Sequence, residues 1–86
     1  MDNKLFIELC KREVKQYVYD HLDKSDETHQ FDVFVVWSCK TLQNNKALLS
    51  TTLSDGMYYE LTYNGDKKEL YLDVYKKCEN RCIKLG

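Results

Sequence analysis

Between Phe31 and Tyr75 the chain alternates apolar and polar residues in four segments, which short runs rich in Asn, Asp, Ser and Gly separate. Alternation of this kind is typical of strands with one buried face, and such runs are typical of tight turns. Strands joined by short turns pair antiparallel with their sequence neighbours, so the pattern predicts a four-stranded β-meander. The four segments are FDVFVVWSCKTL, KALLSTTL, MYYELTY and KKELYLDVY.

The lengths of the three turns decide which side chains share a face of this sheet. Three-residue turns at 43–45 and 54–56 and a two-residue turn at 64–65 bring one apolar set from each strand to a common face. Asn45 and Gly56 can adopt the left-handed conformation that closes a three-residue hairpin, and Asn-Gly favours a type I′ turn. The set expected to be buried is Phe31, Val33, Val35, Trp37, Cys39, Ala47, Leu49, Thr51, Leu53, Met57, Tyr59, Leu61, Tyr63, Leu70, Leu72 and Val74.

The N-terminal residues have the 3.6-residue period of an amphipathic helix. Asp2 or Asn3 can cap its start, and no Gly or Pro follows before about Asp23. The predicted fold class is α+β, in which this helix packs on one face of the four-stranded antiparallel meander and Trp37 lies near the centre of the buried layer. The apolar stripe of the helix consists of Phe6, Ile7, Cys10, Val14, Tyr17, Val18 and His21.

A chain of 86 residues has material for one hydrophobic core, so a single domain is predicted over 1–86. Its parts are a helix at about 2–23, a polar linker at 24–30, the meander at about 31–75 and a tail at 76–86.

The balance of charge limits the kinds of partner. The net formal charge is -1, with 31% charged and 43% hydrophobic residues, which argues against both a disordered polyelectrolyte and a binder that neutralises phosphates. No run approaches the ~20 apolar residues of a membrane span, and the N-terminus lacks the features of a signal peptide. We therefore expect a cytoplasmic protein without membrane association.

The cysteines give little sign of a metal or redox site. Cys78 and Cys82 form one CxxxC pair, whereas structural zinc sites commonly use two close pairs and redox motifs use CxxC. We expect free thiols and predict no metal and no cofactor. Tyr75, both cysteines and Leu85 recur at helical spacing, which favours a short helix or turn in the tail, although the fourth strand could instead continue through Cys78.

No catalytic residue is predicted. His21 is expected to cap the last helical carbonyls or to pack on the apolar stripe, and His29 is expected to be solvent-exposed. With only three glycines, the chain offers no Gly-rich phosphate loop. The sequence therefore favours a protein that is not an enzyme.

A single helix leaves the second face of the sheet uncovered. Aromatic side chains there favour a protein partner, although strands also favour Tyr and Thr without any partner. The carboxylates on this face would repel phosphates and so disfavour nucleic acid. A structural homodimer and a nucleic-acid or nucleotide-binding accessory protein are the alternatives. The predicted partner-binding residues are Phe34, Tyr58, Tyr71, Tyr75, Asp32, Glu60 and Asp73, and the same face is expected to carry Val36, Leu48, Ser50, Thr52 and Thr62.

The strings VVWSCKTLQN, KALLSTTLSDGMYYE and TYNGDKKELYLD resemble a family of small proteins of unknown function from phages and prophages of Gram-positive bacteria. The likeness covers about the last two-thirds of the chain and brings no catalytic residue, cofactor or substrate. It implies a small phage protein in the host cell cytoplasm, outside the capsid and tail machinery. Such proteins frequently bind a host protein and block or redirect it, so the resemblance implies a protein-binding modulator, with an anti-defence inhibitor as one form.

Overall fold

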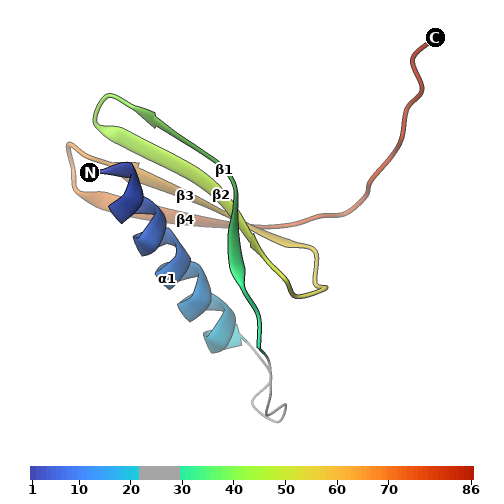
Figure 1. The fold of residues 1–86 in the computed structure, drawn as a ribbon, viewed down its shortest axis with the longest axis horizontal. Helices are drawn as coiled ribbons and strands as arrows, with labels where there is room; N and C mark the ends of the chain where they lie inside the picture. The colour runs from blue at the N-terminus through green and yellow to red at the C-terminus, as the bar shows by residue number, and fades with distance from the viewer. Residues whose placement is uncertain (22–29) are drawn as a thin grey trace.

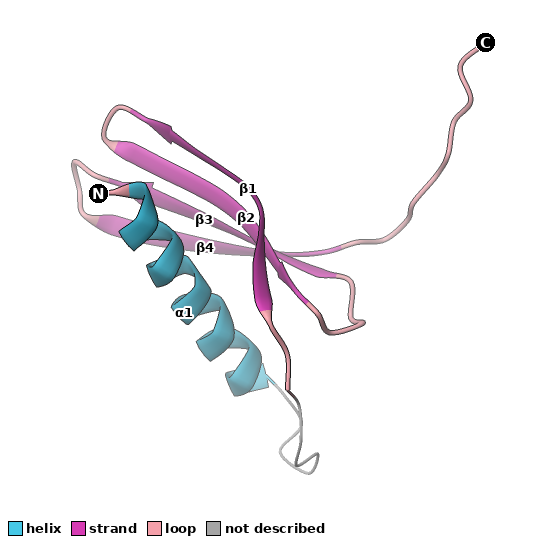
Figure 2. Cartoon of the chain, viewed as in Figure 1, coloured by secondary structure: helices cyan, strands magenta, loops and turns pink. Residues whose placement is uncertain are grey.

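The computed structural model describes residues 1–21 and 30–86, so most of the predicted linker lies outside the described residues. One helix precedes four strands, and each strand pairs antiparallel with the next, in the sheet order β1-β2-β3-β4 (Figure 1). Figure 2 shows the helix lying across one side of the sheet. The predicted α+β fold of a helix on a meander is confirmed. The elements are α1 (Asn3–His21), β1 (Val33–Thr41), β2 (Asn44–Thr51), β3 (Met57–Asn64) and β4 (Glu69–Lys76).

The start of α1 is capped as the sequence predicts. Asp2 Oδ1 accepts a hydrogen bond from the Lys4 amide at 3.3 Å, and the Asp2 carbonyl accepts one from the Phe6 amide at 2.9 Å. Such contacts satisfy amides that have no partner within the helix. One buried residue in each turn then faces the sheet: Phe6, Cys10, Val14 and Val18.

The two central strands supply the other half of the core. Ala47 and Leu49 of β2 and Tyr59 and Leu61 of β3 are buried, as the register predicts. The Tyr17 ring of α1 meets the Tyr59 ring edge-on, with 5.8 Å between centroids. Burying a large apolar side chain stabilises the fold by about 1.5–3 kcal/mol, so this small cluster is the main source of stability.

A β-bulge in β1 changes the predicted faces. The register of β1 against β2 shifts between Val35 and Trp37, so Val36 is an extra residue in β1. Beyond the bulge Trp37 pairs with Leu48, which faces away from α1, and the Trp37 side chain is 42% exposed. The prediction that Trp37 and Cys39 belong to the buried layer is therefore wrong, because one inserted residue reverses the alternation that follows it.

The first turn also differs from the prediction. The turn is formed by Leu42 and Gln43 rather than by 43–45, and Leu42 adopts φ 53°. Asn45 is not a turn residue but a buried residue of β2. A turn of even length, in place of the predicted odd one, moves each residue of β1 to the opposite face of the sheet. The bulge at Val36 moves the residues before it back, so only the first half of β1 has the predicted faces.

The other two turns keep the predicted parity although both are longer. β2 ends at Thr51 and β3 begins at Met57, with Gly56 at φ 68° as expected for a left-handed residue. Residues 65–68, rather than 64–65, connect β3 to β4, and Lys68 adopts φ 53°. Lengthening a turn by an even number of residues leaves the faces unchanged, so β3 and β4 face as predicted.

Beyond β4 the chain leaves the body of the molecule. Residues 77–86, which we call the tail, have no regular structure, are all exposed and extend away from the sheet (Figure 1). The Lys77 amide still donates to the Gly56 carbonyl at 2.8 Å. The short helix predicted for this segment is therefore wrong, and the alternative of a strand through Cys78 extends only as far as this hydrogen bond.

Candidate functional site

The side of the sheet away from α1 is covered by no other element among the described residues, and we call it the open face. Cross-strand pairing arranges its side chains in rows that run from β1 to β4. The rows are Phe34–Ser50–Tyr58–Tyr75, Trp37–Leu48–Glu60–Asp73, Cys39–Lys46–Thr62–Tyr71 and Thr41–Asn44–Asn64–Glu69.

Six of the seven residues predicted for partner binding occupy three adjacent rows of this face. They are Phe34, Tyr58 and Tyr75 in one row, Glu60 and Asp73 in the next, and Tyr71 in the third. The aromatic rings of the face are well exposed, because Phe34, Trp37, Tyr71 and Tyr75 keep 42–51% of their surface in solvent. Large aromatic side chains exposed on one surface are typical of contact sites.

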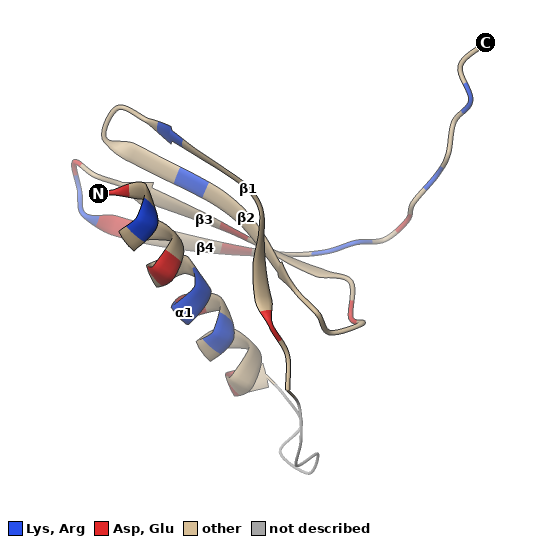
Figure 3. Ribbon diagram, in the orientation of Figure 1, with Lys and Arg blue, Asp and Glu red and all other residues tan. Residues whose placement is uncertain are grey.

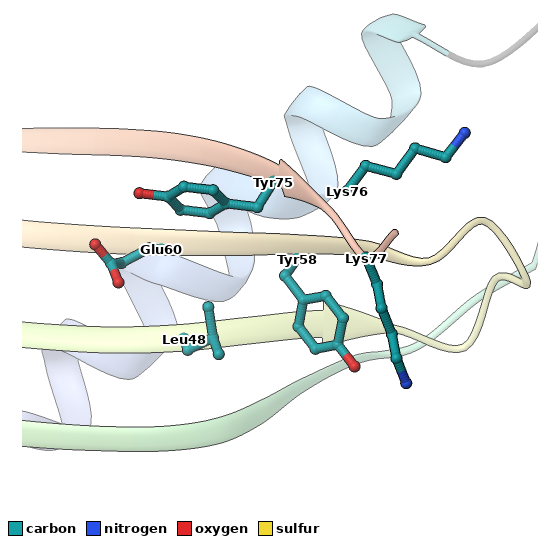
Figure 4. Close-up of a pocket in the computed structure, with 6 residues that line it drawn as sticks. All are labelled: Leu48, Tyr58, Glu60, Tyr75, Lys76 and Lys77. Carbon is teal, nitrogen blue, oxygen red and sulfur yellow. The ribbon is translucent and has the colours of Figure 1, made fainter. Parts of the chain in front are cut away.

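The open face is hollowed near the end of the sheet at which β3 begins and β4 ends. This tyrosine hollow has a volume of about 440 Å³, and Figure 4 shows Tyr58 and Tyr75 on either side of the space, with Leu48 and Glu60 beside them. Apolar area dominates its surface, and the charged groups lie at its rim, a combination typical of binding sites for side chains. The lining residues are Leu48, Tyr58, Glu60, Tyr75, Lys76 and Lys77.

Asp32 is the predicted residue that does not join this group. It lies just before β1, where its amide donates to Thr52 Oγ1 at 2.9 Å. It lines hollows at the edge of the molecule between α1 and β1, beside Lys15 of the helix. Asp32 therefore stands nearer to the basic side chains of α1 than to the tyrosine hollow.

Two carboxylates face each other across the middle of the open face. Glu60 pairs directly with Asp73, and like charges in that position destabilise a sheet unless a cation compensates them. Lys46 partly does so, because its Nζ lies 3.3 Å from Glu60 Oε1. Among the described residues no basic group lies within 4.0 Å of the Asp73 carboxylate. Figure 3 shows these acidic positions on β3 and β4 beside a basic position on β2.

The third tyrosine of the face is held by a neighbour on its own strand. The Tyr71 hydroxyl donates a hydrogen bond to Glu69 Oε2. This hydrogen bond favours the neutral phenol, and with the negative charge of Glu69 it raises the pKa of Tyr71. Tyr71 therefore remains neutral, and its ring lies two residues from Asp73 along β4.

Sequence reasoning missed several residues of this face. Trp37 was assigned to the core because the bulge at Val36 was not foreseen. The one available signal was the unbroken apolar run from Val33 to Trp37, where no alternation shows which face each residue takes. Lys46 is the first residue of the predicted second strand, but it was not included in the predicted face. Lys76 and Lys77 were assigned to a tail rather than to the hollow.

A family model described as a family of unknown function, DUF6275, matches residues 7–85 of the chain. The chain belongs to the DUF6275 family. This confirms the expected membership in a family of unknown function, whereas an origin in phages of Gram-positive bacteria stays a prediction. No curated protein and no solved structure matches this DUF6275 chain.

Metal-ligating side chains of this DUF6275 chain form no cluster in the part of the structure that is described. No three His, Cys, Asp or Glu side chains within 1–21 and 30–86 gather as metal ligands do. His21 contacts the Tyr17 carbonyl at 2.8 Å and stacks on the Tyr17 ring, as the cap prediction requires, and His29 lies outside the described residues. Within that same part of the chain, no helix is long and apolar enough to cross a bilayer.

Proposed function

We propose that this chain binds another protein through its open face and modulates that protein by occupying part of its surface. The observation that carries the proposal is the tyrosine hollow. It lies on the side of the sheet that α1 does not cover, and exposed aromatic rings surround it. Aromatic anchors in a central pocket supply most of the binding energy in many protein interfaces.

The charges of the face indicate the chemistry of the partner. Glu60, Asp73 and Glu69 lie in its rows together with Lys46, while Lys76 and Lys77 lie at the rim of the hollow. The middle of the face, where Glu60 and Asp73 oppose each other, is therefore acidic. Complementary charge raises the association rate and excludes unsuitable partners. The proposed partner therefore presents basic and apolar side chains together.

The resemblance to phage and prophage proteins supports a particular setting for this activity. A small protein made in an infected cell can bind a host protein and block or redirect it without any catalytic residue of its own. We propose that the partner is a host or phage protein in the cytoplasm, and that inhibition of a host defence protein is one form of the modulation.

A pull-down from host lysate followed by reconstitution tests the proposal. The wild type should capture a partner that the purified protein then binds at a fixed ratio, changing the partner's activity. The variant Tyr58→Ala/Tyr75→Ala should no longer bind this partner, because the two substitutions remove both tyrosine rings of the hollow. Tyr19→Ala is the matched control, since Tyr19 is an exposed tyrosine on α1, 48% accessible.

Two outcomes would contradict the proposal. If the double variant unfolds at the same urea concentration as the wild type and still binds every partner, the assignment of the surface is wrong. If the wild type captures nothing that binds it again after purification, the proposed function itself is wrong.

A further inference from the structure

The tail exposes large apolar side chains that nothing in the described structure covers. Ile83 is 74% exposed and Leu85 is 91% exposed, and both lie on a segment that extends away from the sheet (Figure 1). Covering an apolar side chain in that position by any surface that removes it from water is favourable.

The sequence of the tail alternates in a way that gives it two sides. In an extended segment every second residue points the same way, so Glu79, Arg81, Ile83 and Leu85 share one side, and Cys78, Asn80, Cys82 and Lys84 lie on the other. The tail as a whole carries three basic side chains and one acidic side chain, Glu79. Arg81 Nε lies 2.7 Å from Glu79 Oε1, and both side chains are exposed. One side of the tail therefore presents this exposed ion pair followed by two apolar groups.

The open face carries the complementary groups at the same spacing. Asp73 lies between Tyr71 and Tyr75 along β4, opposite Glu60 and without a basic group within 4.0 Å among the described residues. A guanidinium binds carboxylates through paired hydrogen bonds and stacks on tyrosine rings. Adjacent rows are two residues apart along a strand, about 6.6 Å, which is also the distance from Arg81 to Ile83 in an extended tail.

We propose that the tail of a second copy of this chain lies across the open face, with Arg81 over Glu60 and Asp73 and with Ile83 in the tyrosine hollow. The occupant is a second copy because the Lys77 amide is hydrogen-bonded to the Gly56 carbonyl and the segment after it extends away from its own sheet (Figure 1). The ten residues of the tail span up to about 33 Å, enough to run along the strands past all four rows, which lie about 6.6 Å apart.

An exchange of tails between two copies is closed and symmetric. Each copy gives one tail and receives one, so the same contacts form twice and no binding surface is left to extend the assembly. This inference uses the open face on which the proposed function rests, and it adds regulation, since a face that holds a tail is closed to another protein.

Sedimentation equilibrium of the purified full chain, in reductant so that the exposed thiols stay reduced, tests the inference. The mass should rise with concentration from 10.3 kDa towards twice that value. Arg81→Glu should raise the dissociation constant about tenfold or more, since it places a carboxylate over two others. Lys84→Glu is the matched control, with the same change of charge on the other side of the tail. These variants leave the core intact, because Arg81 and Lys84 are exposed in the monomer.

A charge exchange tests the register. Asp73→Lys should weaken the dimer as Arg81→Glu does, and the double variant should regain much of the loss. The inference is overturned if the full chain keeps the monomer mass at all concentrations, if Arg81→Glu leaves the dimer unchanged, or if Lys84→Glu weakens it equally.

The same proteins separate this inference from the proposed function. A chain that ends at Lys77 lacks the tail and keeps the open face. If the full chain is monomeric while the shortened chain captures a protein partner, only the tail exchange is wrong. If the full chain dimerises through Arg81 while neither chain captures a partner, only the proposed function is wrong.

Discussion

Asn45 has a polar side chain that is buried in the sheet layer. It is 1% exposed, and neither Nδ2 nor Oδ1 has a hydrogen-bond partner among the described residues. A buried polar group without a partner destabilises a fold by about 1–3 kcal/mol. Asn45→Leu, of similar volume, should therefore raise the free energy of unfolding by about 1 kcal/mol or more, measured by urea denaturation.

Asn45→Asp is the informative control for this substitution. It places a charge at the same buried position and should lower the free energy of unfolding strongly, because an unpaired buried carboxylate is costly. If Asn45→Leu destabilised the protein instead, Asn45 would have a binding partner that the described residues do not include.

Cys10 gives the core a dependence on pH. Burial, with a smaller contribution from the negative charge of Glu13, raises the pKa of its thiol from 9.0 to about 12. The folded state therefore keeps the proton that the unfolded state releases above pH 9. The protonated Cys10 thiol therefore contributes its full stabilisation below pH 9. As the pH rises from 9 towards 12, the free energy of unfolding falls by up to about 1.4 kcal/mol per pH unit.

Cys10→Ala should remove this part of the pH dependence. Urea unfolding between pH 8 and 10 should show a shallower fall in stability for the variant than for the wild type. Thiol labelling at pH 8 provides an independent reading, because Cys39, Cys78 and Cys82 are exposed and should react at once, while Cys10 should react only on unfolding. Equal slopes together with fast labelling of all four thiols would contradict the prediction.

Among the elements, the sheet could be predicted from the sequence more fully than any single turn. Whether a turn has an odd or an even number of residues decides which face each side chain of the next strand takes. A turn that is two residues longer than predicted therefore leaves the faces unchanged, as between β3 and β4. Gly65 illustrates the limit. It was expected for a type I′ turn, yet the structure needs it because a Cβ there would lie 2.1 Å from the Gln43 carbonyl oxygen, a contact between two hairpins that no local pattern records.

The second half of β1 could not be predicted because its sequence carries no alternation. Five consecutive apolar residues, Val33 to Trp37, fit either face, and only pairing with β2 shows that Val36 is the extra residue. The open face was therefore predicted correctly on β3 and β4 and incompletely on β1. Bulges of this kind depend on tertiary pairing rather than on local propensity.

Tryptophan fluorescence can measure how exposed Trp37 of β1 is to solvent. Trp37 is the one tryptophan of the chain, so the emission reports this position alone. The Trp37 side chain is 42% exposed, so acrylamide should readily quench its fluorescence in the folded protein. For the same reason its emission maximum should shift only slightly on unfolding. Strong protection from the quencher would instead place Trp37 under α1 and contradict the bulge.

The same position of Trp37 can be tested by the loss of stability that two alanine substitutions cause. Trp37→Ala should cost less stability than Leu49→Ala, which removes a fully buried side chain and should cost about 2–5 kcal/mol. The bulge assignment fails if the two costs are reversed.

At the scale of the whole molecule, the two faces of the sheet have different roles. Stability resides in the layer between α1 and the sheet, and the open face and tail contribute little to it in the monomer. The layer is a thin one for a chain of this size, since its fully shielded side chains are the eight hydrophobic residues Phe6, Cys10, Val14, Val18, Ala47, Leu49, Tyr59 and Leu61. A small core of this kind leaves a modest margin of stability.

Removing the tail should therefore separate folding from association. At low protein concentration a chain that ends at Lys77 should unfold within about 0.5 kcal/mol of the full chain, because residues 78–86 are exposed throughout. At high concentration the full chain should gain stability, since a dimer stabilises the folded state by mass action, while the shortened chain should not. Thermal unfolding over a range of concentrations measures both effects. A tail that packed against its own sheet would instead stabilise the full chain equally at every concentration, and that result would assign the apolar side of the tail to the monomer.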